Sequence, residues 1–170
     1  MSNKFPLSQK YIDFINTTNV SAEFLEGTTA SGKTTVGAGV KFMRMVSQSK
    51  KKIHAIAAKT TGKAEETIIQ QDNGILDLHR NAVYCGNGDK DYKLPHIKFE
   101  DKIIYILGYS SRDKWEMVLG AQFGCVYIDE INTADIEFIR EMSTRNDYML
   151  ATLNPDDPSL PVYKEFVNRS

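Results

Sequence analysis

One stretch decides the fold of this chain: Gly27-Thr28-Thr29-Ala30-Ser31-Gly32-Lys33-Thr34. It matches the pattern G-x-x-x-x-G-K-[ST] without a gap, and on average composition such a match arises by chance in roughly one chain of this length in a hundred. The stretch follows an apolar run at residues 22–25, typical of a strand, and opens a helix-length pattern that reaches about residue 47. A strand, a glycine-rich loop and a helix in this order predict a loop that holds phosphate groups.

The residue types in this loop fit that role. Gly27 and Gly32 permit backbone angles that turn successive N–H groups toward a phosphate. Lys33 is expected to reach the β- and γ-phosphates of a nucleotide, and the Thr34 hydroxyl to ligate Mg²⁺. The predicted nucleotide-binding residues of the loop are Gly27, Thr28, Thr29, Ala30, Ser31, Gly32, Lys33, Thr34 and Thr35. The plain alternative is a loop rich in glycine and threonine with a solvated lysine.

A second pattern is an apolar strand that ends in two carboxylates, Cys125-Val126-Tyr127-Ile128-Asp129-Glu130. Its continuous apolar run is typical of a central strand buried on both faces. We expect this strand to lie beside the first one, so that Asp129 falls near the metal through a water and Glu130 holds a water in line with the γ-phosphate. The second carboxylate favours a hydrolase over a nucleotide kinase or a GTP switch. The alternative is an acidic strand end that caps the next helix.

Two further sites are predicted outside these patterns. The strand expected at residues 148–153 ends in Thr152 and Asn154, and such a polar end beside the acidic strand can sense the γ-phosphate and relay hydrolysis. The alternative is an ordinary exit into a turn, because Asn-Pro and Asp-Asp-Pro are turn chemistry. Gln9 precedes Gly27 by eighteen residues, where its side-chain amide could read the edge of adenine. An exposed helix residue is the plain alternative for Gln9.

The rest of the chain alternates short apolar strands with helix-length segments, which predicts an α/β fold with a mainly parallel central sheet flanked by helices. We expect strands at 22–25, 53–58, 126–128 and 148–153, and helices at 8–15, 33–47, 64–71 and 133–144. The segment 79–109 predicts a small antiparallel insertion, with strands at 96–99 and 103–107. In the helix after the loop, one face is expected to carry Val36, Val40, Met43 and Val46. The length suits one domain, residues 1–170.

Composition narrows the function classes. The 170 residues are 41% hydrophobic and 25% charged with a net charge of −1, as in an ordinary soluble domain and not a general polyanion binder. Cys85 and Cys125 fit no paired or metal-ligand spacing, Cys125 has the pattern of a small buried hydrophobe, and the three histidines indicate no role. Neither a signal-peptide core nor a membrane-length apolar stretch is present, so we expect a cytoplasmic protein without a membrane partner.

Together these residues resemble the large terminase subunits of tailed phages, ATPases that pump DNA into procapsids. Four blocks carry the resemblance in order: Leu7-Ser8-Gln9, Phe24 to Thr34, Gly120 to Glu130 with a Gly-x-x-Phe segment, and Thr152-Leu153-Asn154-Pro155. The resemblance implies that Gln9 reads adenine, Glu130 is the catalytic carboxylate, and Thr152 to Asn154 form the coupling motif. It also implies Mg²⁺ and ATP as cofactors, double-stranded DNA, a portal protein and a small terminase subunit as partners, a homo-oligomeric ring on the portal, and location in the host cytoplasm.

Two departures from that family affect the expectations. Terminase loops commonly contain an arginine, which is missing from residues 28–31, so Arg112 and Arg145 are candidates for a charge-stabilising role, with an ordinary surface arginine as the alternative. The chain ends at Ser170 without the acidic cluster of a nuclease, so we expect a C-terminally incomplete ATPase domain that does not cut DNA. Lysines at 50–52, 59 and 63 are candidate DNA contacts, with an ordinary solvated face as the alternative. Two alternatives remain: another P-loop ATPase of the same branch, helicase-like or partner-regulated, or a nucleotide-binding module with little turnover alone.

Overall fold

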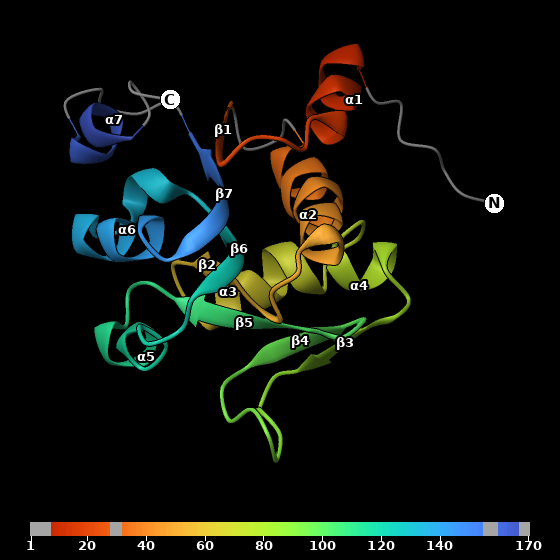
Figure 1. Ribbon diagram of the computed structural model, residues 1–170, viewed down its shortest axis with the longest axis vertical. Helices are drawn as coiled ribbons and strands as arrows, with labels where there is room; N and C mark the ends of the chain where they lie inside the picture. Colours follow the sequence, from red (N-terminus) through yellow and green to blue (C-terminus); the bar gives the residue numbers. More distant parts are fainter. Residues whose placement is uncertain (1–7, 28–31, 155–159, 167–170) are drawn as a thin grey trace.

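The computed structural model describes residues 8–27, 32–154 and 160–166, which form one seven-stranded sheet with helices on both faces (Figure 1). The strand order across the sheet is β1-β7-β6-β2-β5-β4-β3. The strands are β1 (Ala22–Glu26), β2 (Ile53–Ala58), β3 (Ala82–Cys85), β4 (His96–Phe99), β5 (Lys102–Gly108), β6 (Phe123–Ile128) and β7 (Asn146–Leu153). The α/β fold with a mainly parallel sheet is confirmed, because β1, β7, β6, β2 and β5 pair in parallel.

The helices alternate with these strands. They are α1 (Gln9–Asn16), η1 (Thr35–Phe42), α2 (Met43–Gln48), α3 (Thr61–Ala64), η2 (Glu65–Ile69), α4 (Ile75–Leu78), α5 (Arg112–Glu116), η3 (Ile131–Thr133), α6 (Ile136–Ser143) and α7 (Pro161–Glu165). Figure 1 shows α1, α2 and α4 on one side of the sheet and α5, α6 and α7 on the other. No helix among the described residues is long and apolar enough to cross a membrane.

The predicted neighbour of the acidic strand is wrong. We expected β6 to lie beside β1, but β7 lies between them, with Leu25 of β1 paired to Thr152 and Ile128 of β6 paired to Ala151. The last six residues of β7 are buried, so this strand needs a neighbour on each side to satisfy its backbone hydrogen bonds. The order matters for the site, because it places the polar end of β7 between the phosphate loop and the acidic pair.

The antiparallel strands at 79–109 are confirmed, but they extend the central sheet. β3 pairs antiparallel with β4, β4 pairs antiparallel with β5, and β5 pairs in parallel with β2. β5 therefore belongs both to the parallel part of the sheet and to its antiparallel part. The antiparallel pair forms the edge of the same sheet and shares its core, which includes Ile97 of β4 and Ile104 of β5.

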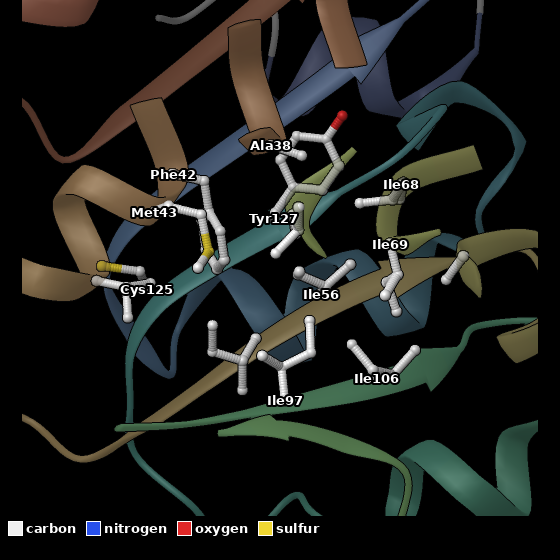
Figure 2. Close-up of a cluster of buried hydrophobic side chains, with 14 of the residues drawn as sticks. Ala38, Phe42, Met43, Ile56, Ile68, Ile69, Ile97, Ile106, Cys125 and Tyr127 are labelled. Atoms are coloured by element: carbon white, nitrogen blue, oxygen red, sulfur yellow. The ribbon is translucent and has the colours of Figure 1, made fainter. Parts of the chain in front are cut away.

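Each face of the sheet covers its own apolar core, because successive side chains of a strand point to opposite faces. In β6, Cys125 and Tyr127 join one core and Val126 and Ile128 the other. Figure 2 shows the first core, where Phe42 from η1 lies near Tyr127 at a ring-centroid distance of 5.9 Å. The buried position predicted for Cys125 is confirmed. Both faces of β6 are fully covered, so the strand that carries the acidic pair is rigidly held.

The helix after the phosphate loop begins with π-helical turns, whereas the sequence predicted an α-helix throughout. Residues 35–42 are π-helical, with more residues per turn than an α-helix, so the buried face drifts along the sequence. Val36, Met43 and Val46 are buried as expected, but Val40 is only half-buried and Lys41 is fully buried. The Lys41 ammonium forms an ion pair with Glu23 at 3.0 Å and donates to the carbonyls of Phe14 and Thr17 at the end of α1. This buried lysine therefore fastens α1 to the body of the domain.

Replacing Phe42 with alanine should destabilise the fold strongly. Its ring is fully buried between η1 and β6, so Phe42→Ala leaves a cavity and should lower the free energy of unfolding by about 3–5 kcal/mol. Urea unfolding measured by circular dichroism checks this. Met117→Ala, at a side chain that is 68% exposed, is the control and should change the free energy by less than about 0.5 kcal/mol. Equal effects from the two variants would contradict the packing described here.

Candidate nucleotide-binding site

A small cavity of about 100 Å³ lies where the parallel strands β1, β7, β6 and β2 end. Parallel sheets bind ligands at this carboxyl edge, where the loops after several strands come together. The residues that line the cavity are Lys33, Thr34, Lys63, Thr67, Asp129, Glu130, Thr152 and Asn154. Six of these eight are residues that the sequence predicted, from three separate segments. The predicted loop, the acidic pair and the polar strand end therefore form one site.

The Lys33 ammonium has three oxygen partners at the bottom of the loop. It donates to the carbonyl of Leu153 at 3.0 Å, to Oδ1 of Asn154 at 2.8 Å, and to the carbonyl of Gly27. An ammonium group has three donors, so all three are satisfied by the protein. Burial lowers the pKa of Lys33 from its usual value, while the nearby charges of Asp129 and Glu130 act to raise it.

Asp129 is a nearly buried carboxylate held by two hydroxyl groups. Its side chain follows β6 and the residue is 8% exposed. The Thr152 hydroxyl donates to its Oδ1 at 3.0 Å, and the Tyr127 hydroxyl approaches the same oxygen at 3.3 Å. Burial raises the pKa of Asp129, and the hydrogen bond from Thr152 is the largest effect that lowers it. Thr34 lies close enough to form a hydrogen bond with Tyr127, so the hydroxyl of the loop and the carboxylate share one neighbour.

Glu130 sits in a strained backbone conformation that aims its side chain into the cavity. Its φ is +48° and its ψ is +54°, in the left-handed region that costs a non-glycine residue about 1–3 kcal/mol. Its N–H donates to the Thr152 hydroxyl at 3.0 Å, and Asn154 Nδ2 lies 3.5 Å from its Oε1. The capping alternative fails here: Glu130 precedes η3 without a side-chain capping bond, and Asp135 caps α6.

A tyrosine that the sequence did not predict holds the backbone of the acidic pair. The Tyr109 hydroxyl lies 3.0 Å from the carbonyl of Asp129, 3.2 Å from that of Glu130 and 2.6 Å from the Thr133 hydroxyl. Tyr109 follows β5 and is buried against Phe138 of α6. No local pattern marks this residue, because its role arises only from the packing of α6 on the sheet. These contacts over-determine the strained turn and keep it in place.

Three other residues were also missed. Tyr127 carries a readable signal, since it lies two residues before Asp129 in a strand and so points to the same face. Lys63 and Thr67 come from α3 and η2, the helices after β2. The sequence marked Lys63 only as a candidate DNA contact, and the structure places it on the cavity that Lys33 also lines. Its position depends on how the helix after β2 packs, which short-range patterns do not encode.

The remaining predicted residues are placed as follows. Gly32 has a φ of +77°, the left-handed conformation that favours glycine, and the helix starts with Val36 N–H donating to its carbonyl at 3.0 Å. Gly27 donates to the carbonyl of Leu153 at 3.3 Å, and Thr35 begins η1 without lining the cavity. The loop residues Thr28, Thr29, Ala30 and Ser31 lie outside the described residues, as do Leu7 and Pro155 of the resembling blocks.

Gln9 and the two candidate arginines lie away from the cavity lining. Gln9 is exposed on α1 and donates from Nε2 to Asp13 at 2.8 Å. Arg112 pairs with Glu116 and Glu137, each at 2.6 Å, and Arg145 pairs with Glu141 at 3.2 Å. Among the described residues that line the cavity, therefore, the cations are lysines and none is an arginine.

Comparison with solved structures identifies the architecture. A large terminase from a thermophilic bacteriophage superposes with a TM-score of 0.75 over 97% of this chain, at 17% sequence identity. The chain has the fold of one part of a phage large terminase. The same terminase in complex with ADP gives a TM-score of 0.74 at 18% identity, and in complex with ATP-gamma-S 0.72 at 16%. The resemblance read from the sequence is thereby confirmed at the level of the fold.

The terminase fold here matches part of a longer chain. The match covers 43% of the thermophilic phage terminase in the first comparison and 42% in the two nucleotide complexes. No protein-family model matches this sequence, and no curated protein matches it. The likeness therefore lies in the three-dimensional arrangement, which is kept at an identity of 16–18%.

Removing the Thr152 hydroxyl should raise the pKa of Asp129 further. Thr152→Val keeps the shape but deletes the donor to the carboxylate, so a smaller fraction of Asp129 is ionised at any given pH. The carboxyl carbon shift of Asp129, followed by NMR through a pH titration, measures this directly. Thr144→Val, at an exposed threonine after α6, is the matched control and should leave the titration unchanged. Identical titration curves for wild type and Thr152→Val would contradict the assigned bond.

Proposed function

We propose that the chain binds Mg-ATP at this cavity and hydrolyses it. The observation that carries the proposal is the convergence of Lys33 and Thr34 with Asp129 and Glu130 on one small cavity at the carboxyl edge of the sheet. A cation, a hydroxyl and two carboxylates in this arrangement are the groups that phosphoryl transfer to water requires. The terminase with the same fold was solved with ADP and with ATP-gamma-S, which supports a nucleotide as the ligand.

Lys33 is the group proposed to hold the phosphates. Its three donors now engage Gly27, Leu153 and Asn154, so a phosphate oxygen would compete with these neutral oxygens for the ammonium. A charged acceptor is the stronger partner, because charge-assisted hydrogen bonds are roughly twice as strong as neutral ones. The helix that follows Gly32 adds its N-terminal N–H groups on the same side. Binding would thus turn the lysine from protein carbonyls to the ligand.

The metal and the attacking water are assigned to the hydroxyl and the carboxylates. Mg²⁺ prefers oxygen ligands and keeps several waters, so the Thr34 hydroxyl, and Asp129 through one of those waters, fit it. Glu130 carries the remaining carboxylate, which we assign to orienting a water for attack. Thr152 contacts both acidic residues, and Asn154 contacts both Lys33 and Glu130, which supports a coupling role for the end of β7.

At the finer level, we propose that this ATPase drives double-stranded DNA into a viral procapsid. The terminase fold supports this role. The proposed setting is a homo-oligomeric ring on the portal protein, with a small terminase subunit as a further partner, in the cytoplasm of the host. Lys33 and Lys63 supply the positive charge of the cavity within this chain.

A second candidate is a nucleotide-binding module that turns over little by itself, and one observation favours it for the isolated chain. No arginine occurs at residues 28–31 or among the described residues that line the cavity. Arginines supplied by a neighbouring protein contribute about 10³–10⁵-fold in related reactions. Another P-loop ATPase of the same branch is the third candidate. ATPase rates of the chain alone and with portal, small subunit and DNA separate the three.

Replacing Lys33 with alanine should abolish nucleotide binding while the fold survives. The variant removes the charge-assisted bonds to phosphate, each worth about 1.5–3 kcal/mol, so affinity should fall at least about 10–100-fold. Isothermal titration calorimetry with Mg-ATP measures the loss, and circular dichroism verifies the fold. Lys59→Ala, at an exposed lysine that does not line the cavity, is the control and should bind as the wild type does. Normal affinity in a folded Lys33→Ala protein would overturn the assignment.

Replacing Glu130 with glutamine should lower the rate of ATP hydrolysis without lowering the affinity for ATP. Glu130→Gln keeps the size of the side chain and loses the charge, so ATP affinity should stay almost unchanged while turnover falls by about 10²–10⁴-fold. Asp129→Asn should instead weaken Mg²⁺-dependent binding as well as turnover. Single-turnover hydrolysis and calorimetry measure the two effects. Glu137→Gln, at an exposed glutamate of α6, is the control. Wild-type turnover in Glu130→Gln would show that another residue activates the water.

A further inference from the structure

A second cluster of ligand-forming side chains lies on the β3–β4 hairpin, at the edge of the sheet away from β1. Cys85 ends β3, and it pairs across the two strands with His96, the first residue of β4. Asp89 lies in the loop between them. One ligand atom of each of these three residues lies within 4.8 Å of the others. The sequence spacing resembled no metal site, because the fold of the hairpin and not a short motif brings the three together.

His96 offers a lone pair to this cluster. Its ring is fully buried, and Nδ1 lies 2.7 Å from the Leu94 carbonyl. A carbonyl only accepts, so Nδ1 carries the proton and a neutral ring has its lone pair on Nε2. Nε2 faces Oδ2 of Asp89 at 3.3 Å and has no hydrogen-bond partner within the described part of the chain. A carbonyl that fixes the other ring nitrogen is the usual support of a metal-binding histidine.

The two carboxylate oxygens of Asp89 have different neighbours: Oδ1 contacts the backbone of the loop, and Oδ2 faces His96. Its Oδ1 accepts from the backbone N–H of Asp91 at 3.0 Å and of Tyr92 at 2.7 Å, which fixes the carboxylate on the turn. Its Oδ2 is buried, faces His96, and lies 2.5 Å from the ammonium of Lys98. The Lys98 ammonium beside this oxygen is the main cause that holds the pKa of Asp89 well below its usual range.

We propose that Cys85, Asp89 and His96 bind Zn²⁺. Sulfur, nitrogen and oxygen ligands together suit zinc, whereas Mg²⁺ and Ca²⁺ prefer oxygen alone. The distances agree: two N or O ligands about 2.0–2.1 Å from a tetrahedral zinc lie about 3.3–3.4 Å apart, and His96 Nε2 and Asp89 Oδ2 are 3.3 Å apart. A water completes the tetrahedron. The thiol of Cys85 loses its proton on binding.

An ion-pair network is the competing explanation, and it accounts for less. Lys98 pairs with Asp89, and a protonated His96 would pair with the same oxygen through Nε2 at 3.3 Å, but this network gives no role to Cys85. The Lys98 side chain is 45% exposed, so it can turn into solvent when a divalent cation takes its place beside Oδ2. The ammonium is thus a competitor of the metal. Its removal should strengthen metal binding.

The role of the metal would be structural. The loop 86–95 projects beyond the sheet in Figure 1, and the three ligands lie at its two ends and on its turn. Tyr92 in this loop packs edge-on to His96 at 5.5 Å between ring centroids. Zinc would fasten the projecting loop to the edge strands and restrict the unfolded chain, as any clip that closes a loop does.

Titration of the metal-stripped full chain with Co²⁺ tests the site. Cobalt replaces zinc with the same geometry, and a thiolate ligand gives a charge-transfer band in the near ultraviolet. We expect this band in the wild type and in Cys125→Ser, which retains Cys85, and its loss in Cys85→Ser. The band reports sulfur ligation, so binding at Asp129 and Glu130 does not produce it. Absence of the band in the wild type, or its persistence in Cys85→Ser, would overturn the proposal.

Two further variants strengthen the test. Removing a residue that merely orients a ligand costs about 10–100-fold in metal affinity, so Asp89→Asn should cost at least that. Its Oδ1 can still accept from the loop backbone, which preserves the turn. Lys98→Gln should bind Zn²⁺ more tightly than the wild type. Zn²⁺ should raise the melting temperature of the wild type but not of Cys85→Ser. Equal zinc affinity in wild type, Asp89→Asn and Lys98→Gln would leave the ion pair as the full explanation.

Discussion

The buried carboxylate of Asp129 is the constraint on which the arrangement of the site depends. A carboxylate removed from water needs donors and positive charge from the protein, and here each comes from a different strand. Thr152 of β7 and Tyr127 of β6 direct hydroxyl groups at it, and Lys33 from the loop after β1 supplies the charge. β7 must therefore lie next to β6, with the loop after β1 on its other side. The strand order of the sheet and the chemistry of its edge satisfy the same requirement.

Most of the fold was predictable because its signals are local. The apolar run that became β2 and the motif around Gly32 are set by neighbouring residues, and both were placed within a residue or two. The order of the strands was not predictable, since the pairing of Leu25 with Thr152 joins segments far apart in the sequence. The π-helical turns after the loop were not predictable either. Because of them Lys41 is fully buried, whereas an α-helical period predicted Val40 on the buried face.

The residues of the candidate site also fall into two groups, those within a sequence motif and those that the packing of other segments brings to the cavity. Residues inside a motif, such as Lys33 and Asp129, could be expected at one site from the sequence, because a motif fixes both residue type and spacing, and both line the cavity. Tyr109 and Lys63 reach the site from other segments and carry no such restriction. The cluster on the β3–β4 hairpin shows the same limit, since Cys85 and His96 are eleven positions apart yet paired across two strands. Their relation follows from strand register, which a scan for spacing does not include.

The amide of Asn154 contacts both the cation from the phosphate loop and the carboxylate from the acidic pair. Its oxygen accepts from an ammonium that can only donate, and its nitrogen faces a carboxylate that can only accept, so the group cannot rotate by half a turn without opposing both neighbours. The two neighbours therefore favour a single orientation of the Asn154 amide. An anion that took the Lys33 ammonium as its partner would leave the amide in contact with Glu130 alone. The orientation of one amide after β7 thus depends on both the cation and the carboxylate of the cavity.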